Sequence, residues 1–294
     1  MADIHIQFTL FSAFYTPLIV TMSGGFLRDE SIDYEWSVAP PGVSAIAAIE
    51  AGTAQVIQSA PSQGLTALQA GKKPSVLHFA QVNEMDGFFI TAREPDNDFD
   101  WKKLEGSEVV LFAGGQPNIM FRYACHIAGI DYTKIKQITP GGAQPIDKAF
   151  RDGQGQYVVQ QGPFPQQLEE EKLGSVVARV GPQIGPCAFS SLAATPQWLS
   201  TDAAPGFIRA YKKARIFLNE HNANEIFQSI SSYFPDTEPQ ALIECIQSYQ
   251  ALGCWTPHVE ITPEAFEVTQ DVFKYVNAID RRFSYAEVCC PPPE

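Results

Sequence analysis

Four segments of the chain share one pattern, in which an apolar run ends at small or amide residues, passes a proline and gives way to helical spacing. The segments are residues 8–17 (FTLFSAFYTP), 54–61 (AQVIQSAP), 109–117 (VVLFAGGQP) and 157–163 (YVVQQGP). Proline at the first helical position costs no hydrogen bond and has its φ fixed near the helical value. Such helix starts expose backbone N–H groups, and ligands of open α/β sheets bind outside the carboxyl ends of the strands. The pattern therefore predicts several helix N-termini that face one cleft.

Strand and helix signals alternate through most of the chain. We expect strands at residues 4–11, 32–38, 54–60, 75–82, 88–95, 108–115, 135–139 and 156–161, with helical spacing between most of them. Between residues 81 and 101 the pattern changes, and there we expect the chain to cross into a second domain. Residues 48–57 and 149–158 repeat one spacing of helix, glycine and strand, once in each half. After residue 195 only helices are expected. This order predicts parallel sheets covered by helices on both faces.

The charge and the apolar pattern exclude two function classes. The chain has 294 residues, a net charge of −13 and only 20 lysines and arginines, which argues against a nucleic-acid partner. It holds no run of about 18 apolar residues, so we expect no segment that spans a membrane. The N-terminal sequence MADIHIQFTLF has no basic region followed by a separate apolar region, so we expect no secretory leader in it.

The six cysteines show no C-x-x-C spacing and no nearby pair of histidines, so we expect no metal site. Cys125 and Cys245 lie on apolar helical faces and are expected to be buried. Cys245 and Cys254 could form a disulfide only if a turn between two helices brings them together. Cys289 and Cys290 precede Pro-Pro-Pro-Glu, and we expect them in a frayed tail.

Three stretches of the chain carry a resemblance to a known family. They are AIAAIEAGTAQVIQSAPSQGLTALQAGKKPSVLH, FFITAREPDNDFDWKKLEGSEVVLFAGGQPNIMFRYACHIAGI and AFRDGQGQYVVQQGPFP. With the order of elements, they resemble the periplasmic solute-binding proteins of the nitrate, sulfonate and thiamine-precursor group, which includes the NMT1/THI5-like domain. The resemblance covers roughly residues 4–280. Its motifs are glycines, apolar residues and turns, and therefore specify the fold better than the ligand.

The resemblance implies an α/β protein with the two-lobed periplasmic-binding-protein type II fold, in which mixed sheets are covered by helices and two crossing strands form a hinge. Lobe one would be residues 1–86 plus 190–294, and lobe two would be residues 87–189. The resemblance further implies that the lobes close on a small molecule. Residues 12–15, 59–63 and 81–83 would line one wall of the cleft, opposite residues 114–118 and 160–162.

Several positions depart from the family pattern. Gln55 and Gln156 stand where an acid is usual after the helix-closing glycine. Gln63 takes the position of a histidine in the thiamine-pyrimidine synthases of this fold, and only Cys187 remains of their cysteine-rich run. Phe14 stands where the aryl-sulfinate desulfinases of this fold have a nucleophilic cysteine. We therefore expect neither of these two chemistries.

No predicted loop offers a nucleophile with a base in hydrogen-bond reach. If the chain is an enzyme, the candidate catalytic residues are Glu84, His78 and Tyr15. His78 lies within a predicted strand and is typical of a core histidine. Glu84 lies at the predicted crossing, where an acid that holds a backbone N–H is the more usual finding.

The predicted loops instead carry uncharged residues, many of them amides, with two aromatic rings. The predicted ligand-binding residues are Ser12, Phe14, Tyr15, Ser59, Ser62, Gln63, Asn83, Gly114, Gly115, Gln116, Asn118, Gln160, Gln161 and Cys187. Amides donate and accept hydrogen bonds, and aromatic rings stack on flat molecules. A free divalent anion would usually recruit an arginine. The set therefore favours a small polar molecule, planar or heterocyclic, over such an anion.

We expect the substrate-binding component of an ABC-type uptake system, with a small-molecule ligand, a transporter permease as its partner, a monomeric state and no cofactor. The alternative is a leaderless cytoplasmic enzyme of the same fold that acts on a small aromatic or heterocyclic acid by lyase or hydrolase chemistry. The resemblance implies a periplasmic location if a leader was removed, and Met1 as the native start would imply a cytoplasmic one.

Overall fold

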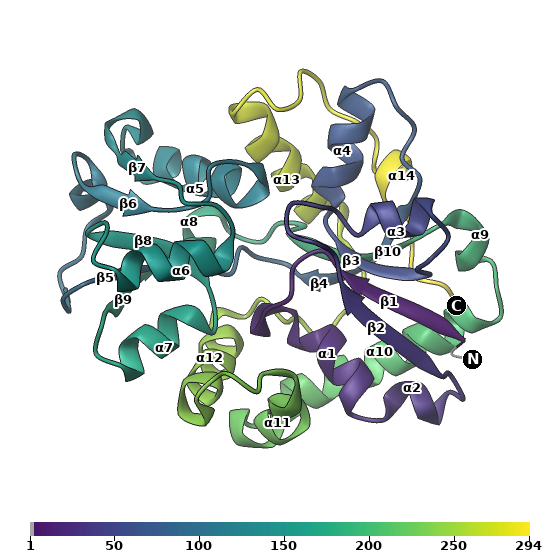
Figure 1. The fold of residues 1–294 in the computed structure, drawn as a ribbon. Helices are drawn as coiled ribbons and strands as arrows, with labels where there is room; N and C mark the ends of the chain where they lie inside the picture. The colour runs from purple at the N-terminus through teal and green to yellow at the C-terminus, as the bar shows by residue number, and fades with distance from the viewer. Residues whose placement is uncertain (1–2) are drawn as a thin grey trace.

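The strands form two five-stranded sheets in the computed structural model, which describes residues 3–294. The first sheet, in the order β2-β1-β3-β10-β4, contains β1 (Ile4–Phe8), β2 (Tyr34–Val38), β3 (Val56–Ser59), β4 (Leu77–Asn83) and β10 (Ser190–Ala194). The second, in the order β7-β6-β8-β5-β9, contains β5 (Phe88–Ala92), β6 (Glu108–Val110), β7 (Lys136–Ile138), β8 (Tyr157–Gln161) and β9 (Ser175–Arg179). Each sheet belongs to one lobe, and the lobes lie side by side in Figure 1.

The two sheets have the same pattern of directions. In the first, β1 pairs in parallel with β2 and β3, and β10 runs antiparallel to β3 and β4. In the second, β6 pairs in parallel with β7 and β8, and β5 runs antiparallel to β8 and β9. The repeat between residues 48–57 and 149–158 therefore falls on equivalent elements, because β3 and β8 occupy the same place in their sheets.

The antiparallel strand of each sheet arrives from the other lobe. The chain leaves β4 at the edge of the first sheet and enters β5, and it returns from β9 into β10. These two connections form the hinge of crossing strands that the resemblance implies. The predicted boundaries at residues 86/87 and 189/190 lie between these strands and remain predictions.

Helices cover both sheets (Figure 1). Those of the first lobe are α1 (Thr16–Ser23), α2 (Phe26–Asp29), α3 (Ile46–Glu50), α4 (Pro61–Gln69), α9 (Pro196–Leu199), α10 (Ala203–Glu220), α11 (Ala223–Ile230), α12 (Pro239–Leu252), α13 (Pro263–Tyr275) and α14 (Tyr285–Val288). Those of the second are α5 (Gly115–Ile127), α6 (Ala143–Arg151), α7 (Phe164–Glu170) and α8 (Gly181–Ile184). Short 3-10 helices lie at η1 (Ala13–Tyr15), η2 (Trp101–Leu104), η3 (Tyr132–Lys134) and η4 (Ser231–Tyr233). No helix within residues 3–294 is long and apolar enough to cross a membrane.

The hydrophobic core continues from one lobe into the other. Phe14 packs against Phe189 and Tyr249, with ring centroids 5.4 and 5.0 Å away. A Cβ atom at Gly87 would lie 2.2 Å from Phe14 Cε2, so only glycine allows the crossing strand to approach this ring. The phenyl ring therefore fixes how closely the first lobe packs against the hinge.

The alternation of elements and the helical C-terminal region agree with the sequence prediction, and the mixed sheets agree with the resemblance. The parallel sheets expected from the order of elements are wrong, because β10 and β5 run antiparallel to their neighbours. Each predicted strand is present, although several are shorter than expected. The prediction that Cys289 and Cys290 lie in a frayed tail is wrong. The peptide N–H of Cys290 donates to the carbonyl of His78 (3.0 Å), and Cys289 is buried beside β4. Cys125 and Cys245 are fully buried as predicted, and all six thiols are free.

Candidate ligand-binding site

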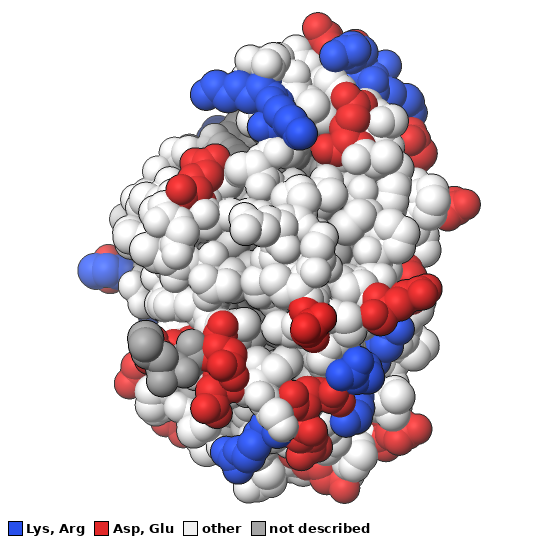
Figure 2. Space-filling view, turned by 90° about the vertical axis from the view of Figure 1, so that its right-hand side faces the viewer, with Lys and Arg blue, Asp and Glu red and all other residues white. Residues whose placement is uncertain are grey.

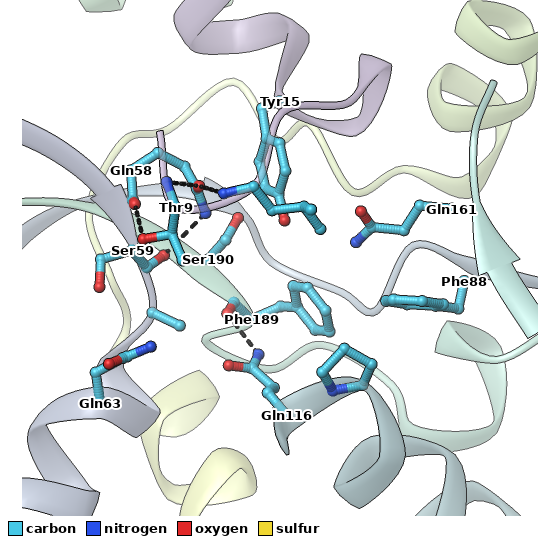
Figure 3. A pocket seen from close by; sticks show the side chains of 13 residues that line it. Thr9, Tyr15, Gln58, Ser59, Gln63, Phe88, Gln116, Gln161, Phe189 and Ser190 are labelled. Atoms are coloured by element: carbon cyan, nitrogen blue, oxygen red, sulfur yellow. Dashed lines mark hydrogen bonds between the residues drawn. The ribbon is translucent and has the colours of Figure 1, made fainter. Parts of the chain in front are cut away.

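A cavity lies between the lobes, where the segments that follow β1, β3, β6 and β8 meet (Figure 3). Its volume is about 170 Å³. The lining residues are Thr9, Leu10, Tyr15, Gln58, Ser59, Ala60, Gln63, Phe88, Gln116, Pro117, Gln161, Phe189 and Ser190. Most of these residues stand at the carboxyl ends of parallel strands or in the first turn of the following helix, which is where α/β sheets bind their ligands.

Gln58 fixes the loop that follows β1. Its side-chain Oε1 accepts the peptide N–H groups of Thr9 (3.1 Å) and Leu10 (3.2 Å). The Thr9 hydroxyl donates to the carbonyl of Gln58 (2.9 Å) and accepts the N–H of Ala45 (3.1 Å). These contacts hold Leu10 against the cavity. They also engage the Gln58 amide oxygen and the Thr9 hydroxyl in hydrogen bonds within the protein.

Two pairs of side chains join the lobes on opposite sides of the cavity. The Ser62 hydroxyl of α4 donates to Gln116 Oε1 of α5 (2.6 Å), and Gln116 Nε2 donates to the carbonyl of Phe189 (2.7 Å). The Ser12 hydroxyl before η1 donates to Gln161 Oε1 of β8 (3.2 Å). The structure therefore shows the two lobes in contact around the cavity.

Several uncharged polar groups on the cavity wall keep hydrogen-bonding capacity that the described protein atoms do not use. Ser59 Oγ is buried and has no partner. Ser190 Oγ accepts from Asn83 Nδ2 (2.8 Å), which leaves its own proton free to donate. The Gln63 and Gln161 amides point into the cavity in Figure 3, as does the Tyr15 ring. A ligand here meets both donors and acceptors.

No lining residue among those described carries a charge. Burial raises the pKa of the Tyr15 hydroxyl well above its ordinary value, so the group stays protonated and can donate. The N-termini of α4 and α5 also meet the cavity, through Ala60, Gln63, Gln116 and Pro117. Pro61 and Pro117 each remove one N–H from these first turns, which lowers the number of donors available to an anion.

Asp86 is a buried acid two residues before the lining residue Phe88, and burial raises its pKa to about 7. Its Oδ1 accepts the N–H of Phe88 (2.7 Å), whereas its Oδ2 has no partner among the described residues. Its charge also contributes to the raised pKa of Tyr15. The cavity wall is thus uncharged, and a buried carboxyl with a raised pKa lies close to it in sequence.

A comparison with known families matches residues 13–224 to the family described as "NMT1/THI5 like". The chain belongs to this NMT1/THI5-like family. A search of curated proteins finds that the chain is 26% identical to "Putative binding protein YtlA" of Bacillus subtilis (strain 168) over 281 residues, which cover 94% of this chain and 84% of that protein.

Solved structures show which fold the NMT1/THI5-like chain shares. The alkanesulfonate-binding protein SsuA from Xanthomonas axonopodis pv. citri, bound to MOPS, superposes with a TM-score of 0.74 at 15% identity, covering 99% of both chains. The ligand-binding component of an ABC-type import system from Staphylococcus aureus, with zinc bound, superposes with a TM-score of 0.75 at 13% identity, covering 98% of this chain and 96% of that one. These likenesses show the periplasmic-binding-protein fold.

The structure brings part of the predicted ligand-binding set to the cavity of this NMT1/THI5-like protein. Tyr15, Ser59, Gln63, Gln116 and Gln161 line it. Ser12, Ser62 and Asn83 lie behind the wall and hydrogen-bond to Gln161, Gln116 and Ser190.

The other predicted residues lie outside the lining. Phe14 is fully buried in the core, and Gly114 and Gly115 begin α5 without lining the cavity. Asn118 Nδ2 donates to the Phe112 carbonyl and to the Tyr132 hydroxyl, both at 2.8 Å, and thereby fixes the preceding loop.

Gln160 and Cys187 are the remaining predicted residues outside the lining. Gln160 Nε2 donates to Asp147 (3.2 Å), because neighbouring residues of a strand point to opposite faces and Gln161 takes the cavity face. Cys187 is buried, and burial raises the pKa of its thiol.

The three candidate catalytic residues are not brought together on the cavity wall. His78 Nδ1 pairs with Ser191 Oγ (2.7 Å), and burial lowers the pKa of His78 to about 3. The Glu84 carboxylate contacts His258 Nε2 (3.0 Å) and the Thr262 hydroxyl (3.3 Å), rather than the backbone N–H that we expected. Of the three, only Tyr15 lines the cavity.

The sequence prediction missed much of the apolar wall. Leu10, Phe88 and Phe189 were not predicted, nor were Thr9, Gln58 and Ser190, whereas Ala60 and Pro117 lie inside the predicted wall ranges 59–63 and 114–118. Thr9, Leu10 and Gln58 stand inside segments that the proline pattern marks, and that pattern is the signal that could have located them. Phe189 and Ser190 come from the returning strand, and no local pattern locates that strand at the cavity. Among residues 3–294, no three histidine, cysteine, aspartate or glutamate residues form a group that could hold a metal ion.

Proposed function

We propose that this protein is the solute-binding component of an ABC-type uptake system and that it holds a small, uncharged, planar molecule in the interlobe cavity. The observation that carries the proposal is the unpartnered, buried Ser59 hydroxyl on a cavity wall without charges. A buried polar group without a partner costs about 1–3 kcal/mol, and a ligand that pairs with it would recover that cost.

The size of the cavity supports a ligand of one ring. A cavity of about 150 Å³ accommodates benzene, and this cavity has about 170 Å³. The Tyr15, Phe88 and Phe189 rings surround the space in Figure 3 and offer faces or edges to a flat molecule. The amides of Gln63 and Gln161 would then meet polar atoms on the edge of the ring.

The wall chemistry supports a neutral ligand over an anion. A tightly held sulfonate or carboxylate usually recruits arginine or lysine, and the lining within the described residues has neither. The helix N-termini favour atoms with partial negative charge, such as a carbonyl oxygen or a ring nitrogen. A heterocycle with carbonyl and N–H groups meets all of these conditions.

Two facts support the transport role. This chain shares its fold with the Staphylococcus aureus protein, which is the ligand-binding component of an ABC-type import system. The two pairs Ser62–Gln116 and Ser12–Gln161 connect opposite sides of the cavity and would hold closed lobes together around a ligand. We propose that a permease recognises the closed form outside the cytoplasmic membrane, and that the protein acts as a monomer.

Isothermal titration calorimetry of the full chain tests the ligand class. The panel contains neutral pyrimidinones, such as uracil and its isomers, and matched single-ring carboxylates and sulfonates. We expect saturable binding of a neutral ring and recovery of that compound unchanged by mass spectrometry. Binding of the anions alone would overturn the ligand class, and chemical conversion of the compound would overturn the binding role.

Uptake by cells tests the transport role separately. Deletion of the gene should abolish uptake of the compound that calorimetry identifies, and reintroduction of the gene should restore it. The protein should be recovered from the extracytoplasmic fraction of these cells. Unchanged uptake in the deletion strain would contradict the transport role and leave the ligand assignment intact.

A further inference from the structure

A second, smaller hollow adjoins the cavity and extends between the lobes. It has a volume of about 20 Å³ and is lined by Leu10, Phe11, Ser12, Phe88, Phe112, Ala143, Gln161 and Phe164. We call it the aromatic pocket. Leu10, Phe88 and Gln161 also line the main cavity, so the two spaces share a wall and adjoin each other.

Both lobes build the aromatic pocket from apolar side chains. Phe88 and Phe112 of the second lobe meet edge to face, with ring centroids 5.9 Å apart. Phe11 of the first lobe stacks on Trp36 at 5.1 Å and on Phe234 at 5.3 Å, so its position is fixed from behind. The pocket is therefore complete only when the lobes are together.

The two polar residues of the aromatic pocket are already engaged with each other. Ser12 Oγ donates to Gln161 Oε1 (3.2 Å) and accepts the N–H of Phe14 (3.3 Å). An ordered water needs two to four polar partners. The pocket offers little to a water molecule, and an apolar group of its size is the better occupant.

The aromatic pocket also separates the uncharged cavity from a charged outer groove. Phe11, Ser12 and Phe164 line both the pocket and this groove, whose volume is about 470 Å³. The groove carries the ion pair of Arg151 with Asp147 (2.5 Å). A substituent that reaches from the cavity thus meets the phenyl rings before it meets charge or solvent.

We propose that the aromatic pocket is an apolar subsite that selects a ring with one short alkyl substituent, of methyl or ethyl size. The inference rests on the proposed function, because the ring itself would occupy the main cavity. The polar cavity wall then hydrogen-bonds to the edge of the ring, and the phenyl groups of both lobes pack against its substituent.

Calorimetry with matched ring compounds tests the subsite. The probes are uracil and its monomethyl isomers, with the methyl group at each ring position in turn. We expect one isomer to bind at least about four-fold more tightly than uracil, because burial of one methylene-sized group contributes about 0.8 kcal/mol. Isomers with the methyl group elsewhere should bind equally or more weakly.

Substitutions test whether the gain in affinity for the methylated isomer comes from the aromatic pocket. Ala143→Leu fills the pocket and should remove the preference for the methylated isomer while uracil still binds. Phe112→Ala enlarges the pocket and should shift the preference towards the ethyl or propyl analogue. Ala128→Leu, a half-buried alanine of the same lobe outside the cavity and the pocket, is the matched control and should keep the preference. Thermal unfolding checks that each variant is folded.

The outcomes separate this inference from the proposed function. If uracil binds but no methyl isomer gains affinity, or if the gain persists in Ala143→Leu, the subsite is refuted and the neutral-ring proposal stands. If no ring of the panel binds, the proposed ligand chemistry fails and the subsite fails with it. A preference that is lost in Ala128→Leu as well would also refute the subsite.

Discussion

Ser62 Oγ donates to Gln116 Oε1 across the two lobes at 2.6 Å. Ser62 is in the first turn of α4 and Gln116 in the first turn of α5, so this hydrogen bond connects two helix starts that sequence patterns already mark. Gln116 also donates to the Phe189 carbonyl (2.7 Å), so both the oxygen and the nitrogen of its amide have a partner. The contact can exist only when the lobes are together.

Ser62→Ala should weaken ligand binding by favouring open lobes. One hydrogen bond contributes about 0.5–1.5 kcal/mol to the stability of the closed form. Its loss should therefore raise the dissociation constant of the ligand roughly 2- to 12-fold. Calorimetry measures the affinity, and small-angle X-ray scattering should show a larger radius of gyration without ligand. Ser75→Ala removes an exposed hydroxyl of the first lobe that bonds to Glu50, and it should change neither quantity. Equal affinities of Ser62→Ala and the parent would contradict this role.

Ser59→Ala should separate affinity from stability. The Ser59 hydroxyl has no protein partner, so its removal should leave the free energy of unfolding unchanged or raise it by up to about 1–3 kcal/mol. The affinity for the ligand should fall, because the ligand loses a partner. Denaturant unfolding and calorimetry measure the two effects.

Thr91→Val is the matched control for Ser59→Ala. Thr91 in β5 is also fully buried with an unpartnered hydroxyl, but it does not line the cavity. We expect its substitution to affect unfolding alone. A loss of affinity of the same size in Thr91→Val would show that the effect of Ser59→Ala is not local to the cavity.

Local patterns predicted many of the helices and strands, because these elements depend on the conformations of neighbouring residues. The proline after each apolar run marks a helix start through its fixed φ, and α4 and α5 begin within two residues of Pro61 and Pro117. The repeat of helix, glycine and strand predicted two equivalent halves. The type of fold followed from the resemblance, which carries information about distant pairings that spacing alone does not hold.

Tertiary contacts decided the parts of the site that the sequence did not predict. Gln160 and Gln161 are chemically identical neighbours, and only the orientation of β8 in its sheet directs Gln161 to the cavity. Phe14 was expected on the cavity wall, but its ring is fully buried and packs against Phe189 and Tyr249. Phe189 reaches the cavity from the returning crossing strand, far from every marked segment.

Asp86→Asn should reduce the pH dependence of stability. Burial raises the pKa of Asp86 from 3.8 to about 7 in the folded protein. A raised carboxyl pKa means that stability is fully present below the unfolded value near 4 and is lost as pH rises towards 7. Because one pKa unit corresponds to about 1.4 kcal/mol, the loss is on the order of a few kcal/mol.

The measurement for Asp86 is the free energy of unfolding between pH 4 and pH 8, taken as the difference between variant and parent. Asparagine keeps the acceptor for the Phe88 N–H and cannot ionise, so the difference should grow in favour of the variant up to about pH 7 and then level off. Asp98→Asn, at an exposed loop position, should give a flat difference. A flat curve for Asp86→Asn would contradict a raised pKa at this site.

Gly87→Ala should destabilise the hinge through one steric contact. The new methyl group would lie 2.2 Å from Phe14 Cε2, and this ring is held between Phe189 and Tyr249. Overpacking of this kind costs about 1–3 kcal/mol, so we expect the free energy of unfolding to fall by that amount.

The double variant Gly87→Ala with Phe14→Leu should be less destabilised than the sum of the two single variants, because leucine makes room for the methyl group. Gly114→Ala is the control, since a Cβ there meets no atom within 4 Å and its φ of −171° suits any residue. Additive losses in the double variant would show that Phe14 does not set the approach of the crossing strand.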